Sequence, residues 1–175
     1  MRTILVFCML LAVGGPSAAS AEGRCTGFKW DISQELALFG GAEVAVAAGK
    51  TVAAAPAIGP GRLYELELAP QSQVVFAMTP GKNSAADGAF AGLARLTLDS
   101  PGRYRIAVDA PLWIDVVADG RLAVVTDFQG QQNCDGPHKI VEFDLSGARQ
   151  FVLQISGSAR ATPRLTVTRS PPRKL

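Results

Sequence analysis

Residues 103–120 read RYRIAVDAPLWIDVVADG and contain the clearest strand pattern in the chain. Tyr104, Ile106 and Val108 occupy alternate positions, and a period of two is typical of a half-buried strand. The β-branched run that follows ends at Asp119-Gly120, the commonest signal for a two-residue hairpin turn. This segment therefore predicts two strands and the turn that leads into a third.

The same alternation recurs on both sides of this segment, at residues 64–68, 151–155 and 165–168. Less regular apolar runs lie at residues 44–47, 51–54, 74–78, 93–98 and 140–145. Glycine and proline pairs separate these runs, as expected for turns between strands. We predict an all-β, single-domain β-sandwich or jelly roll of about nine or ten antiparallel strands. Residues 33–39 fit a short helix equally well, with Ser33 as its capping residue.

The composition limits the kinds of site that this chain can build. Its 175 residues include 17 Lys+Arg, 15 Asp+Glu and one His. A single histidine excludes, within one chain, metal sites that need two or more imidazoles. Because the charge is nearly balanced, no nucleic-acid partner is expected. No cofactor is expected either, although calcium, which needs only oxygen ligands, stays open as a candidate.

The N-terminal residues have the composition of an export signal. Arg2 precedes the apolar residues 4–13, and Ala19-Ser20-Ala21 matches a small-residue cleavage site. We expect residues 1–21 to be removed as a signal peptide, residues 22–169 to form the β-sandwich domain and residues 170–175 to form a flexible basic tail. No other apolar run approaches the roughly 18 residues that a membrane span needs. The expected location is periplasmic or secreted.

Cleavage at this site would remove Cys8 and leave Cys25 and Cys134 in an oxidising compartment. Two cysteines in an exported chain predict a disulfide bond. They lack the Cys-x-x-Cys spacing of a redox pair, so the predicted role of the bond is stability.

The loop of residues 129–139 is the richest in polar side chains, and loops on a rigid scaffold often carry function. We select Gln131, Asn133, His138 and Lys139 as candidate ligand-binding residues. Asp135 with His138 is the alternative, because an aspartate can orient an imidazole that accepts a proton from a serine. No Gly-x-Ser-x-Gly motif presents such a serine, and Ser84, Ser156 and Ser158 lie outside any recognisable motif.

Trp113 and Asp115 are two positions apart in a predicted strand and therefore share one face of it. An aromatic ring beside a carboxylate on an exposed sheet face resembles many sugar-binding sites, although a tryptophan at such a position also serves as core. We add Trp113 and Asp115 to the candidate ligand-binding residues.

Four motifs carry a resemblance to a known family: the Gly102-to-Val108 run, the Trp113-to-Val117 run, the Lys139-to-Leu145 run and the Phe151-to-Ser156 run. Together they resemble the pre-peptidase C-terminal type of bacterial β-sandwich, over residues 62–168. The order of cysteine, tryptophan, Gly-x-Tyr-Arg, Trp-x-Asp-Val, cysteine and His-Lys is also similar to small exported proteobacterial proteins of unknown function. The family resemblance implies a jelly-roll accessory domain of secreted proteins.

Two functional hypotheses follow. The first is a non-catalytic extracytoplasmic binding or accessory domain, whose ligand is a glycan or an envelope protein. The second is a secreted hydrolase that uses His138 with Asp135. The oligomeric state is not predicted. An exposed Trp113 would favour the first hypothesis, and a serine hydroxyl within hydrogen-bond reach of His138 would favour the second.

Overall fold

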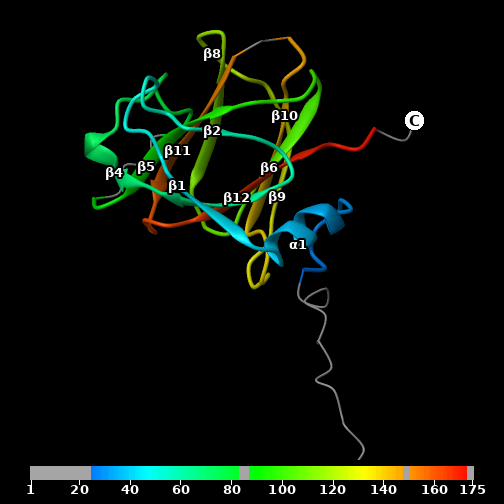
Figure 1. The fold of residues 1–175 in the computed structure, drawn as a ribbon. Coiled ribbons are helices and arrows are strands. Elements are labelled where there is room, and N and C mark those ends of the chain that lie inside the picture. The colour runs from blue at the N-terminus through cyan, green and yellow to red at the C-terminus, as the bar shows by residue number, and fades with distance from the viewer. Residues whose placement is uncertain (1–24, 83–86, 148–149, 173–175) are drawn as a thin grey trace, which may run out of the picture.

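A computed structural model describes residues 25–82, 87–147 and 150–172, which fold into two packed β-sheets (Figure 1). The expected signal peptide and residues 173–175 of the expected tail lie outside the described residues. The predicted all-β sandwich is confirmed. No helix in the described part of the chain is long and apolar enough to cross a membrane.

Twelve strands, one α-helix and one 3-10 turn make up the described structure. They are α1 Ser33–Phe39, β1 Glu43–Ala47, β2 Ala57–Ile58, β3 Leu63–Glu67, β4 Ala69–Pro70, the 3-10 turn Gln71–Gln73, β5 Phe90–Leu96, β6 Arg103–Val108, β7 Trp113–Ala118, β8 Arg121–Leu122, β9 Val125–Gly130, β10 Lys139–Asp144, β11 Phe151–Ser158 and β12 Arg164–Arg169. Sheet A has the order β1-β3-β12-β6-β10-β9, and sheet B has the order β2-β5-β11-β7-β8, with β4 paired to β5.

The predicted hairpin is present between β7 and β8, where Ala118 pairs with Arg121. Asp119 has a φ of 48° and Gly120 a φ of 74°. Positive φ at both central residues is what a type I′ turn requires, and aspartate followed by glycine tolerates it. The predicted helix at residues 33–39 is also present.

Four details of the sequence-based prediction are wrong. Residues 51–54 form a turn, because the Ala54 amide donates to the Thr51 carbonyl instead of to a strand. Residues 74–78 are irregular, and the Met78 amide bonds to the Gln154 side chain. Ile32, not Ser33, precedes the helix, and the Asp31 carboxylate accepts the Ser33 amide hydrogen. Finally, the β1–β3 and β2–β5 pairs are parallel.

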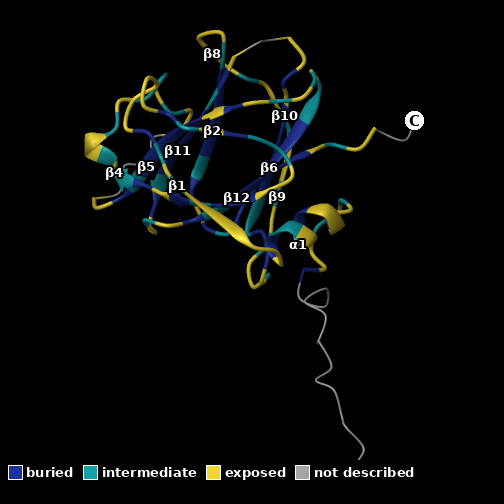
Figure 2. Cartoon of the chain, viewed as in Figure 1, coloured by how far each residue is buried: buried dark blue, intermediate teal, exposed yellow. Residues whose placement is uncertain are grey.

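The main core lies between the two sheets, as the predicted alternation requires. Tyr104, Ile106 and Val108 of β6 are completely or almost completely buried there, and Ile114 and Val116 of β7 face them from sheet B. Figure 2 shows this dark interior band, with exposed residues mainly in turns, in β1 and β9 and on the helix surface. Burial of these apolar side chains is the dominant stabilising contribution to such a fold.

A second apolar cluster covers the outer face of sheet A. It consists of Cys25, Ile32, Phe39, Leu63, Ala107 and Ile140. Residues 25–32, which we call the N-terminal segment, and α1 supply the first three of these residues. Both therefore pack against the outer face of sheet A. The predicted disulfide joins Cys25 to Cys134 across a sequence separation of 109 and fixes the start of this segment to the loop before β10.

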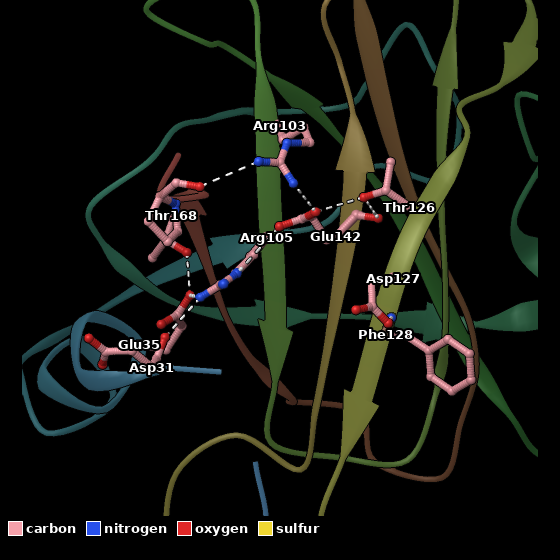
Figure 3. Close-up of polar contacts among 10 residues, drawn as sticks. Asp31, Glu35, Arg103, Arg105, Thr126, Asp127, Phe128, Glu142 and Thr168 are labelled. Atoms are coloured by element: carbon pink, nitrogen blue, oxygen red, sulfur yellow. Dashed lines mark hydrogen bonds and ion pairs between the residues drawn. The ribbon is translucent and has the colours of Figure 1, made fainter. Parts of the chain in front are cut away.

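Beneath this segment lies a cluster of charged side chains (Figure 3). The Arg105 guanidinium lies 3.7 Å from a carboxylate oxygen of Glu35 and 3.7 Å from one of Glu142. All three side chains are buried. Arg105 also donates to the Asp31 carbonyl at 2.9 Å, and Thr168 donates to Glu35 at 2.6 Å. These contacts compensate for part of the cost of removing the charges from water.

Removal of the disulfide should destabilise the fold. In the chain-entropy model, a loop of about 100 residues contributes about 4.7 kcal/mol, so the Cys25→Ala/Cys134→Ala variant should lose about 4 kcal/mol in free energy of unfolding. Urea unfolding under oxidising conditions measures this loss. Reduction of the native protein should lower its urea midpoint to that of the variant. Equal urea midpoints for the variant and the oxidised native protein would contradict the prediction.

Glu142 should contribute to stability in a pH-dependent way. Burial alone would raise the pKa of its carboxyl, but the neighbouring Ser170 hydroxyl, a hydrogen bond from Thr126 and the charges of Arg103 and Arg105 lower the pKa below its usual value. Its stabilising contribution is therefore fully present above the unfolded pKa, about 4.3, and is lost as pH falls through the lower folded pKa.

Glu142→Gln should therefore lower the free energy of unfolding at pH 7 by about 3 kcal/mol, because it removes one of the two carboxylates beside the buried Arg105 and the carboxylate that pairs with Arg103. The difference from the native protein should shrink as pH falls below about 4. Denaturant unfolding at several pH values tests this, with Glu67→Gln, at an exposed position of β3, as the control. A constant difference at every pH would refute the assignment.

Candidate functional site

The loop of residues 129–139 is divided between two roles. The Gln131 side-chain oxygen accepts a hydrogen bond from the Gly27 amide at 2.9 Å, and the Gln129 side chain does the same for the Lys29 amide at 2.6 Å. Asn133 is exposed at a φ of 64°, a conformation that asparagine tolerates. This half of the loop holds the N-terminal segment.

His138 and Lys139, at the end of the loop and the start of β10, lie elsewhere. They line a cavity of about 310 Å³ together with Lys82, Pro111, Leu112, Trp113 and Gly157. We call it the Trp113 cavity. The structure thus brings together three of the sequence-predicted residues: Trp113 from β7 of sheet B, and His138 and Lys139 from the start of β10 in sheet A and the residue before it.

Two lysine side chains approach the Trp113 ring. The Lys82 Nζ lies 5.8 Å from the ring centroid and the Lys139 Nζ lies 5.4 Å from it. Both distances are within the range of a cation–π interaction. Lys139 also donates a hydrogen bond to the Leu112 carbonyl, which further restricts the position of its ammonium group.

Asp115 is next to this cavity but is not an open ligand group. It shares the outer face of β7 with Trp113, as predicted, but it is buried. Its carboxylate accepts hydrogen bonds from the Trp113 Nε1–H at 2.9 Å and from the Gly81 amide at 2.9 Å. The geometry makes Asp115 a positioning residue, which orients the tryptophan ring and anchors the segment that leads to Lys82.

Gly81 must come close to make this contact. A Cβ at position 81 would lie 3.0 Å from the Asp115 Oδ1 and 3.4 Å from the Trp113 Nε1. The missing side chain is therefore what allows the backbone to lie directly against the carboxylate. Residues 76–82 cover Asp115 because of this contact and because Gln154 bonds to both Met78 backbone groups.

The Trp113 cavity is electrostatically positive. Burial is the main cause that lowers the pKa of Lys139, the positive charge of Lys82 lowers it further, and the charge of Asp115 partly opposes both. Two ammonium groups near one ring repel each other, and the nearby Asp115 carboxylate is already engaged by three hydrogen-bond donors, from Trp113, Gly81 and Gln154. An anion between the lysines would relieve this repulsion.

Sequence reasoning did not find Lys82, Pro111, Leu112 or Gly157. Lys82 lies in an irregular segment and is 31 positions before Trp113 in the chain, so no periodic pattern links the two. Gly157 interrupts the alternation of β11 at a φ of 67°, where the β5–β11 register shifts, and a glycine inside a strand is a sequence signal of such an irregularity.

The two residues of the alternative hydrolase site line different cavities. His138 lines the Trp113 cavity, whereas Asp135 lines a larger one, of about 520 Å³, between α1 and the disulfide loop. Within the described residues, no hydroxyl group hydrogen-bonds to the His138 ring. Ser158 bonds to the backbone of Arg160, Ser156 is buried, and Ser84 lies outside the described residues.

No group of three or more His, Cys, Asp or Glu side chains within residues 25–82, 87–147 and 150–172 is placed to hold a metal ion.

Comparison with known proteins identifies no relative. No family model matches the chain, and no curated protein matches it. Among solved structures, a β-glucosidase from Kluyveromyces marxianus in complex with glucose aligns with a TM-score of 0.33 and 7% sequence identity, over 54% of this chain and 12% of the glucosidase chain. A TM-score this low does not establish a common fold.

Asp115→Asn should loosen the segment over the Trp113 cavity. The amide side chain has one oxygen to replace two acceptors, so the Gly81 amide or the Trp113 Nε1–H loses its partner, at a cost of about 1–3 kcal/mol. Amide hydrogen exchange at Gly81 should become faster. Asp119→Asn is the matched control, because asparagine tolerates the exposed turn; equal protection of Gly81 in both variants would contradict this role of Asp115.

Proposed function

We propose that this protein is a non-catalytic extracytoplasmic binding domain that holds an acidic glycan in the Trp113 cavity. The observation that carries the proposal is the pair of lysine ammonium groups, 5.8 and 5.4 Å from the centroid of one tryptophan ring. The ring offers an apolar surface to a sugar, and the ammonium groups offer charge-assisted hydrogen bonds to its carboxylate, sulfate or phosphate.

The charge balance around the cavity supports an anion over a neutral or cationic ligand. Lys82, Lys139 and His138 line it, and no carboxylate among the described residues does. Lys139 is partly buried, and removing a cation from water without a counter-charge is costly. A ligand that places an anionic group between Lys82 and Lys139 supplies the missing counter-charge.

The size and shape of the cavity support a glycan over an envelope protein. A concave site of about 310 Å³ is at the lower end of the range for small-molecule sites, and it holds a sugar unit more readily than a protein surface. The Cys25–Cys134 disulfide supports a location outside the cytoplasm, since such bonds persist in oxidising compartments.

Binding of methyl β-D-glucuronide, measured by titration calorimetry, tests the proposal. Methyl β-D-glucoside, which lacks the carboxylate, is the neutral comparison ligand. We expect the glucuronide to bind at least tenfold more tightly, because a hydrogen bond to a charged group contributes about 1.5–3 kcal/mol. Lys82→Met and Lys139→Met should each weaken glucuronide binding about tenfold and leave the weak glucoside binding unchanged.

Arg62→Gln is the matched control, because it removes one positive charge from an exposed position beside β3, on the far side of sheet A from β9 and β10. It should bind the glucuronide as the native protein does. Equal affinity for the charged and the neutral sugar, or equal losses in the Arg62 and Lys139 variants, would refute the proposal.

A further inference from the structure

The sandwich is open along one side, where the edges of the two sheets face each other. In sheet B, β8 pairs only with Val117 and Ala118, so the first half of β7 is an edge in the described part of the chain. In sheet A, the outermost strand on this side is β9. The core between the sheets is therefore least covered between the start of β7 and β9.

An apolar slot of about 130 Å³ opens at this place. It is lined by Trp113, Ile114, Val125, Phe128, Lys139 and Val141, and we call it the β7–β9 slot. Ile114 and Val141 belong to the main core, whereas the Phe128 side chain is 68% exposed and that of Val125 is 47% exposed. The slot thus connects the hydrophobic core with the surface.

The register of sheet A explains why Phe128 and Val125 lie at this slot. Val141 pairs with Phe128, and Phe143 pairs with Val125, and directly opposed residues of an antiparallel pair point to the same face. Both β9 residues therefore point toward the inner face, beyond the point where sheet B covers it. Figure 3 shows the Phe128 ring directed away from the charged cluster on the outer face.

The slot and the Trp113 cavity share a wall. Trp113 and Lys139 line both. A ligand whose anionic group lies between Lys82 and Lys139 therefore reaches the slot by passing the tryptophan ring. The apolar lining is suited to hydrocarbon, and the shared lysine provides a counter-charge at the slot's entrance.

We propose that the ligand is amphiphilic: an acidic sugar that carries an acyl or alkyl chain, with the chain in the β7–β9 slot. This inference rests on the proposed function and names the ligand class of the same site. A volume of about 130 Å³ holds about four methylene groups, taking each as about the size of a water molecule, about 30 Å³ in the liquid. The gain in affinity should therefore stop after a short chain.

Methyl, n-butyl and n-octyl β-D-glucuronide, compared by titration calorimetry below the concentration at which they form micelles, test the inference. Each buried methylene contributes up to about fourfold in affinity, so the butyl compound should bind at least tenfold more tightly than the methyl compound. The octyl compound should add less than tenfold to this. Octyl β-D-glucoside, with the same chain and no charge, should bind at least tenfold more weakly than octyl β-D-glucuronide.

Variants separate the two parts of the site. Phe128→Ser should remove most of the gain from methyl to butyl and leave methyl glucuronide binding unchanged, whereas Lys139→Met should weaken all three glucuronides. Val75→Ser is the matched control, because Val75 is 67% exposed and lies outside the slot. It should behave as the native protein does.

The possible failures are distinguishable. If methyl glucuronide binds and the longer chains add nothing, the amphiphilic ligand is refuted and the proposed function stands. If no glucuronide binds, both are refuted. If octyl glucoside binds as well as octyl glucuronide, the β7–β9 slot is a nonspecific apolar site. If the protein forms a dimer in solution that protects Phe128, a second copy of the chain occupies the slot. Either result overturns the inference.

Discussion

The Arg105 guanidinium lies between the carboxylates of Glu35 and Glu142, beneath the N-terminal segment, with the Trp30 ring 4.5 Å away. This contact exists because the central strands of sheet A bury both faces. The inner face faces sheet B, and the outer face lies under residues that come from the other end of the chain. A charged side chain on that outer face must find partners in the covering segment, and α1 supplies Glu35 for this purpose.

The same covering decides where a ligand has access. The disulfide, the glutamine side chains of the 129–139 loop and α1 all act to hold the N-terminal segment on sheet A. Residues 129–134 of that loop are therefore largely structural. The other end of the loop leads into β10. There the Lys139 ammonium lies 5.4 Å from the centroid of the Trp113 ring, which belongs to the opposite sheet.

Within the site, Asp115 and the lysines have separate tasks. The aspartate is engaged by Gly81 and by the indole N–H, so it sets the ring and the covering segment in place. The ammonium groups of Lys82 and Lys139 lie 5.8 and 5.4 Å from the centroid of that ring. Like charges held at short range in a partly dry cavity favour an anionic ligand, and the adjoining apolar slot favours one with a hydrocarbon part.

Much of this molecule follows from local patterns in the chain. The alternation in β6, the Asp119-Gly120 turn and the two cysteines were enough to predict the sandwich, its hairpin and its disulfide, because strand faces and turn geometry depend on neighbours in sequence. The pattern failed at residues 51–54 and 74–78. Those segments are mostly apolar and each contains two β-branched residues. Their amides nevertheless bond to a turn, a loop and a side chain, because strand propensity does not determine the hydrogen-bond partner.

The sequence alone determined that Trp113 and Asp115 share a strand face and that His138 and Lys139 are adjacent. Only the tertiary structure decided that Asp115 is covered by Gly81, that Lys82 and Lys139 meet at one ring, and that Asp135 and His138 line different cavities. The reason is physical. The spacing of side chains within a strand is set by the backbone. A site assembled from two sheets and an irregular segment depends instead on how those elements pack, and long-range burial and hydrogen bonding together determine that packing.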